Sequence, residues 1–74
     1  MDEGFILANK YRRAVFEELA SGEGNIIRIA KKHRIILSIV KRVILEFERE
    51  DIVKNQQGRY IFTKKGERLR QSLG

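Results

Sequence analysis

The chain has 74 residues, of which 42% are hydrophobic and 35% are charged, with no cysteine and a formal net charge of +6. This length allows one small domain, and the lack of cysteine excludes disulfide bonds and thiolate metal sites. No apolar run approaches the roughly 18 residues of a membrane span, and Met1-Asp2-Glu3 is acidic where a signal peptide is basic, so we expect a cytoplasmic protein without membrane contact.

The first predicted element is a helix over residues 5–20. Tyr11, Val15 and Leu19 repeat every four residues and so share one helical face. The segment Phe5-Ile6-Leu7 is more apolar than one short helix requires. It covers the core or meets a partner chain, and both readings stay open.

Two further helices are predicted within residues 25–50. Asn25 is a good N-cap, because its side-chain oxygen accepts from the first free amides of a helix. Apolar residues then follow at helical spacing, and His33, on the same face, is expected to be a half-buried packing residue. A break at Arg34-Ile35 separates this helix from a longer one over residues 37–50.

The longer helix has one apolar and one cationic face. At 100° per residue, the core-facing stripe consists of Val40, Val43, Ile44 and Phe47. The opposite side carries Ser38, Lys41, Arg42 and Arg49. Glu46 follows Arg42 by four residues, so an Arg42–Glu46 surface ion pair is expected.

The last third predicts a β-hairpin and a helix. β-branched and aromatic residues at 52–55 and 58–62 flank a turn at Gln56-Gln57, with Ile52, Tyr60 and Phe62 toward the core and Lys54 and Arg59 near the tip. Thr63 is the expected N-cap of a helix over residues 64–73, where Leu69 and Leu73 share a face.

Positive charge gathers in the later elements. Residues 1–24 have a net charge of −2, whereas residues 25–50 and residues 51–74 have +4 each. Clustered cations of this kind attract the phosphates of nucleic acids. The alternative is a solubilising surface without a polyanionic partner.

Residues 25–66 resemble a known family, the MarR-like and related prokaryotic and archaeal winged helix-turn-helix transcriptional regulators. The family's helix-turn-helix pattern aligns without gaps on Asn25-Ile26, Ile29-Ala30, Ile35, Ser38, Val40, Arg42, Ile44, Phe47-Glu48 and Ile52-Val53. The end of the family's wing matches Tyr60, Phe62-Thr63 and Lys65-Gly66.

The resemblance implies an α+β, mostly α fold. It would be a single winged-helix domain over residues 1–74, with a three-helix core, a helix-turn-helix at 25–50, a two-stranded wing at 51–63 and a short C-terminal helix at 64–73. The second helix of the motif would enter the major groove of double-stranded DNA, and the wing would lie on the adjacent backbone. The expected DNA-binding residues are Arg28, Lys32, Ser38, Lys41, Arg42 and Arg59.

The family also implies a homodimer, a transcriptional regulator and a nucleoid-associated location. The candidate dimer interface consists of Phe5, Ile6, Leu7, Leu69 and Leu73.

Three positions depart from the family pattern. Arg34 and Asp51 stand where the family often has glycine, and Ile36 stands where a Ser or Thr usually caps the helix. A non-glycine residue at Arg34 carries a conformational cost if the turn needs a positive φ, and isoleucine cannot cap a helix.

Several apolar residues stand where the family more often has polar ones. They are Ile27, Ile36, Leu37, Ile39, Leu45 and Ile61. Leu45 falls in the middle of the cationic face of its helix. Extra core, a protein interface and, for Leu37 or Ile39, contact with thymine methyl groups are the three readings.

Catalysis is not indicated. One histidine and no cysteine leave no metal set, and no phosphate loop, nucleophile elbow or cofactor motif occurs. We therefore expect a DNA-binding protein, sequence-specific or architectural. The alternatives are a winged-helix adaptor that binds protein within a larger complex, and a protein that binds structured RNA.

Overall fold

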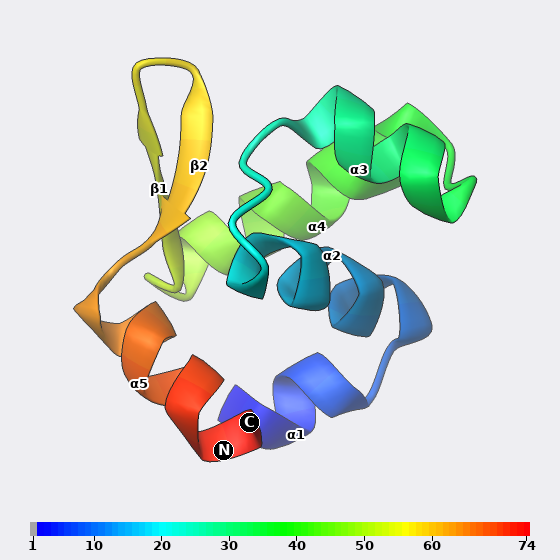
Figure 1. Cartoon of the computed structure of the whole chain (residues 1–74). Coiled ribbons are helices and arrows are strands. Elements are labelled where there is room, and N and C mark those ends of the chain that lie inside the picture. Colours follow the sequence, from blue (N-terminus) through cyan, green and yellow to red (C-terminus); the bar gives the residue numbers. More distant parts are fainter. Residues whose placement is uncertain (1) are drawn as a thin grey trace.

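Five helices and a two-stranded hairpin make up the fold, as a computed structural model of residues 2–74 shows (Figure 1). In chain order the elements are α1 (Asp2–Leu7), α2 (Lys10–Ala20), α3 (Ile26–His33), α4 (Leu37–Arg49), β1 (Val53–Gln56), β2 (Arg59–Phe62) and α5 (Lys64–Leu73). The mostly helical α+β class expected from the sequence is confirmed. None of the helices in residues 2–74 has the length and apolar character that crossing a bilayer requires.

The first predicted helix is in fact two helices. Asn9 has extended backbone angles, and its Oδ1 accepts hydrogen bonds from the amides of Tyr11 at 2.8 Å and Arg12 at 3.2 Å. Asn9 is therefore the N-cap of α2, and α1 ends before it. A single helix over residues 5–20 was the wrong prediction, because an asparagine within an apolar pattern can start a new helix there.

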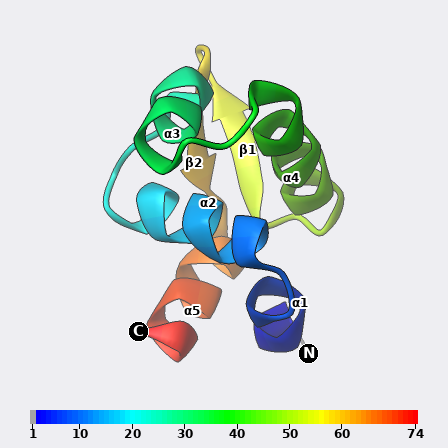
Figure 2. The same ribbon diagram turned by 90° about the vertical axis from the view of Figure 1, so that its right-hand side faces the viewer.

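The core lies between α2, α3, α4 and the base of the hairpin, and α1 and α5 close it from one end (Figure 2). Phe47 of α4 is fully buried at its centre. Its ring meets the edges of Phe5 and Phe16, with centroids 6.2 and 6.3 Å away. The other buried apolar residues are Ile6, Val15, Phe16, Leu19, Ile29, Ala30, Val40, Val43, Ile44, Ile52, Val53 and Leu69.

The α3–α4 turn depends on a left-handed residue. Arg34 has φ 53° and ψ 42°, and the amide of Ile35 donates back to the carbonyl of Ala30 at 3.0 Å. This is the Schellman arrangement, in which glycine is usual because a side chain in this region costs about 1 kcal/mol. Asp51 (φ 59°) ends α4 in the same way, with the Ile52 amide donating to the Phe47 carbonyl at 2.8 Å.

The predicted register of α4 is confirmed. Its core-facing stripe is buried, whereas the opposite side is exposed. The helix follows Ile36, which makes no side-chain capping bond and is 69% exposed. The first amides of α4 are therefore not capped by a side chain.

The hairpin pairs β1 with β2 in antiparallel register, from Val53 opposite Phe62 to Gln56 opposite Arg59. The turn is Gln57-Gly58, one residue later than expected. Both turn residues have positive φ, 56° and 87°, as a type I′ turn requires, and Asn55 Oδ1 accepts from the Gly58 amide at 3.0 Å. Glycine at the second turn position selects this register.

The hairpin is held against the rest of the fold from two sides. On one side, the Tyr60 amide donates to the carbonyl of Gly24 at 3.0 Å, so β2 lies beside the loop that joins α2 to α3. On the other side, Ile52 is fully buried as predicted, while Tyr60 and Phe62 are half-buried and pack on the core. Thr63 Oγ1 accepts from the Gly66 amide at 3.1 Å, which confirms Thr63 as the N-cap of α5.

Candidate nucleic-acid interface

Three of the predicted DNA-binding residues lie together on α4. Ser38, Lys41 and Arg42 are exposed on adjacent turns of the face opposite the core. Within residues 2–74, none of the ion pairs or side-chain hydrogen bonds engages Lys41 or Arg42. Both cations are therefore directed at solvent with their charge uncompensated by a contacting carboxylate.

The segment that carries these residues contains no acidic side chain. Between Asn25 and Leu45 there are six basic residues and no Asp or Glu. They are Arg28, Lys31, Lys32, Arg34, Lys41 and Arg42, and all six are exposed. Lys31 and Arg34 were not among the predicted DNA-binding residues, although the basic run of residues 31–34 was a signal for them.

Glu46, the first acidic residue after this segment, does not pair with Arg42 as expected. Arg12 of α2 binds it with two parallel contacts, Nε to Oε1 at 3.1 Å and Nη2 to Oε2 at 3.2 Å. The same guanidinium donates to the Phe5 carbonyl at 3.1 Å and lies 4.0 Å from the centroid of the Phe5 ring. Arg12 is therefore a partly buried bridge between α1, α2 and α4.

The remaining predicted DNA-binding residues have different surroundings. Arg28 is exposed on α3. Lys32 is also exposed, but its Nζ lies 3.3 Å from Glu18 Oε2 on α2. Arg59 Nη2 donates to the Gly22 carbonyl at 3.3 Å, so this side chain lies along the α2–α3 loop. The structure thus groups Ser38, Lys41 and Arg42 but gives Lys32 and Arg59 contacts within the chain.

Glu18 is a buried charged residue that the sequence pattern did not reveal. Glu18 is only 8% exposed, and its Oε2 lies 2.8 Å from His33 Nε2. His33 itself is half-buried, as predicted. Burial raises the pKa of Glu18, but the hydrogen bonds and charges of His33 and Lys32 outweigh it, and the net pKa lies below the ordinary 4.5. The contact partners lie 15 and 14 residues away in sequence, beyond any local pattern.

The Glu18 contacts should make folding sensitive to acid. A carboxyl group with a lowered folded-state pKa stabilises the fold above its unfolded pKa, and this contribution is lost as the pH falls through the folded value. We expect the free energy of unfolding, measured with urea, to fall on acidification from about pH 6 to about pH 3, and to fall less in Glu18→Gln. Glu17→Gln is the matched control, because Glu17 is exposed on the same helix. An equal fall in Glu18→Gln and the wild type would contradict the assignment.

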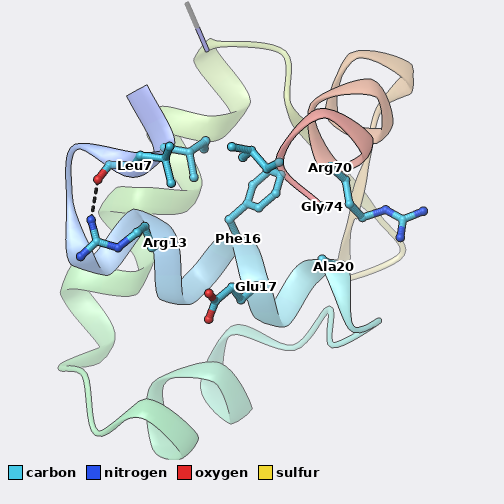
Figure 3. A pocket seen from close by; sticks show the side chains of 9 residues that line it. Leu7, Arg13, Phe16, Glu17, Ala20, Arg70 and Gly74 are labelled. Atoms are coloured by element: carbon cyan, nitrogen blue, oxygen red, sulfur yellow. Dashed lines mark hydrogen bonds between the residues drawn. The ribbon is translucent and has the colours of Figure 1, made fainter. Parts of the chain in front are cut away.

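An apolar groove lies between α1, α2 and α5 (Figure 3). It has a volume of about 210 Å³ and is lined by Ile6, Leu7, Phe16 and Leu73 among others. Figure 3 shows the Arg13 side chain donating to the Leu7 carbonyl and the Arg70 guanidinium directed away from the groove. Arg70 Nε donates to Glu67 Oε1 at 2.8 Å. Small-molecule sites normally combine an apolar wall with converging polar groups, and this groove lacks them.

Only part of the predicted dimer interface lies at the surface of the chain. Ile6 and Leu69 are buried inside the chain and Phe5 is half-buried, because α1 packs on α5. Of the five predicted residues, only Leu7, 51% exposed, and the half-buried Leu73 border the groove with accessible surface. The apolar excess of residues 5–7 is used mainly for the core.

Polar contacts also join α1 to α5. Lys65 Nζ lies 3.5 Å from Asp2 Oδ2, and the Ser72 hydroxyl donates to Glu3. The Ser72 hydrogen bond is the main cause that lowers the pKa of Glu3 to about 2. The first and last helices therefore contact each other through both their apolar and their polar side chains.

No group of three or more His, Cys, Asp or Glu side chains in residues 2–74 has an arrangement that could hold a metal ion. Comparisons with protein families, with characterised proteins and with solved structures find no match for this chain.

Proposed function

We propose that the chain is a winged helix-turn-helix protein that binds double-stranded DNA through the outward face of α4, as a transcriptional regulator or an architectural protein of the chromosome. The observation that carries this proposal is the α4 face itself. Ser38, Lys41 and Arg42 are exposed and free of ion pairs in residues 2–74, within a segment that lacks acidic residues.

The order and packing of the elements support the winged-helix assignment. Helices α2, α3 and α4 pack around one core, α3 and α4 are joined by a short turn, and a hairpin follows directly. In helix-turn-helix proteins the second helix of the pair is the one that lies in the major groove. Here that helix is α4, whose buried stripe fixes it to the domain while its cations face outward.

The start of α4 also suits a polyanion. Its first amides have no side-chain cap, since Ile36 cannot accept from them. Free amides and the positive end of the helix dipole favour a phosphate at this position. A DNA phosphate would satisfy groups that a Ser or Thr cap satisfies in other helices.

Titration of duplex DNA at several salt concentrations tests the proposal. We expect log K to fall linearly with log salt concentration, because bound phosphates release counterions. Arg42→Ala should weaken binding by about tenfold and reduce the magnitude of the salt slope by about 1. Arg68→Ala is the matched control, because Arg68 is also an exposed arginine but belongs to α5, which packs on α1 and β2.

Two other results would redirect the proposal. Equal losses in the Arg42 and Arg68 variants would mean that net charge, and not the α4 face, drives binding. Preference for a structured RNA competitor over duplex DNA in the same assay would favour RNA as the partner.

The second candidate function is a protein-binding adaptor. It is favoured by the exposed apolar side chains Ile27 (51%), Ile36 (69%) and Leu45 (53%) on and between α3 and α4. Exposed apolar groups of this number often mark contact surfaces. Negligible binding of duplex DNA at low salt would favour the adaptor.

A further inference from the structure

Leu45 occupies the centre of the outward face of α4. It is 53% exposed, although its neighbours Ile44 and Phe47 are buried. With 3.6 residues per turn, Leu45 lies one turn after both Lys41 and Arg42, and its side chain falls between their positions around the helix axis. A surface that lies along this face and meets both cations therefore also passes close to Leu45.

On one side, the Leu45 side chain borders other residues of the fold. It borders a cleft of about 220 Å³ between α4, the start of α3 and β2, which is lined by Ile26, Lys41, Ile44, Leu45, Glu48 and Tyr60. The other exposed apolar residues differ in position: Ile36 precedes α4, and Ile27 belongs to α3. Leu45 is thus the one apolar side chain that Lys41 and Arg42 bracket on α4.

The chemistry of the DNA groove then limits what Leu45 can contact. The edges of the bases in the major groove are hydrogen-bond donors and acceptors, apart from the 5-methyl group of thymine and the C5–H of cytosine, and of these two the methyl group has the larger apolar surface. A leucine held against donors and acceptors would leave them without water or a partner, which is unfavourable. Against a thymine methyl group, both apolar surfaces are removed from water.

We propose that Leu45 contacts the 5-methyl group of a thymine in the major groove and thereby selects thymine at one position of the binding site. This inference rests on the proposed function, because it places the outward face of α4 on DNA. It assigns a specificity role to a residue that otherwise has no partner in the DNA-binding surface.

The test begins with selection of bound duplexes from a random pool by the wild-type chain, which should give one position with a strong preference for thymine. Each thymine of the selected site is then replaced, one at a time, by deoxyuridine, which removes only the methyl group. At one position we expect the wild type to bind about fourfold more weakly, the value for burial of one methyl group. Leu45→Ala should bind the thymine and deoxyuridine duplexes equally.

Two variants serve as controls. Leu45→Met keeps an apolar side chain of similar volume and should retain the thymine preference. Ile36→Ala removes another exposed apolar side chain, which lies before α4 and not between Lys41 and Arg42, and should also retain the thymine preference. Because Leu45 is exposed, Leu45→Ala should unfold at nearly the wild-type temperature, so a lost preference would not reflect unfolding.

The outcomes separate this inference from the proposed function. Duplex binding with no thymine preference, or a deoxyuridine effect that persists in Leu45→Ala, would overturn the thymine contact and leave DNA binding intact. Absence of duplex binding by the wild type would remove the proposed function and this inference together.

Discussion

Replacement of Gly66 by alanine should unfold a large fraction of the protein. Gly66 lies in the first turn of α5, and a Cβ atom there would come within 2.1 Å of the Ile52 carbonyl oxygen and 2.9 Å of Phe62 Cδ1. The Ile52 carbonyl cannot easily move away, because it accepts from the Thr63 amide at 3.0 Å and follows the left-handed Asp51. One added methyl group therefore forces α5 away from the base of the hairpin.

The expected loss is about 3–5 kcal/mol, at the upper end of single substitutions. A domain of this size has a total stability on the order of 5 kcal/mol, so the variant should keep at most about 2 kcal/mol, and at the upper end of the expected loss about half of the molecules should be unfolded at ambient temperature by circular dichroism. Gly4→Ala is the matched control, because no atom lies within 4 Å of the corresponding Cβ and Gly4 lies in α1. The control should be neutral or stabilising by up to about 1 kcal/mol. Similar urea midpoints for the two variants would contradict the close packing of α5 on Ile52.

Phe47→Ala should be nearly as destabilising. The Phe47 side chain is fully buried and its ring contacts those of Phe5 and Phe16. Truncation removes the central ring of the core and leaves a cavity between α1, α2 and α4, which costs about 3–5 kcal/mol. The free energy of unfolding from urea titration measures this loss.

Leu45→Ala is the control for Phe47→Ala, two residues earlier on the same helix. Because Leu45 is half exposed, its truncation should cost less than about 1 kcal/mol. The difference between the two variants tests the rotation of α4 about its axis, on which the solvent exposure of Lys41 and Arg42 depends. A larger loss from Leu45→Ala than from Phe47→Ala would mean that the cationic face is turned toward the core.

The sequence predicted the parts of the fold that local patterns determine. The buried stripe of α4 follows from the spacing of Val40, Val43, Ile44 and Phe47. The first residues of α3 and α5 follow from Asn25 and Thr63 as N-caps. The hairpin was expected, but its turn was placed one residue too early. The break at Asn9 was missed because an N-cap inside an apolar pattern looks the same as a polar position on the outer face of one long helix.

The candidate site was predictable only in part. The exposure of Lys41 and Arg42 depends on their own helix, so its periodicity was sufficient. The contacts of Lys32 with Glu18, of Arg59 with Gly22 and of Arg12 with Glu46 join residues 14, 37 and 34 positions apart. Such contacts depend on how the helices and the hairpin pack on one another, and a pattern within one helix cannot supply that information.

The Arg12–Glu46 bridge has a consequence for the kinetics of encounter with a polyanion. Glu46 is the carboxylate nearest in sequence to Lys41 and Arg42, and Arg12 of α2 already forms an ion pair with it. The Glu46 carboxylate therefore repels an approaching polyanion less than an unpaired carboxylate on α4 would. Electrostatic attraction of a polyanion to Lys41 and Arg42 accelerates association and weakens as the ionic strength rises. The Arg12–Glu46 ion pair therefore contributes to the association rate.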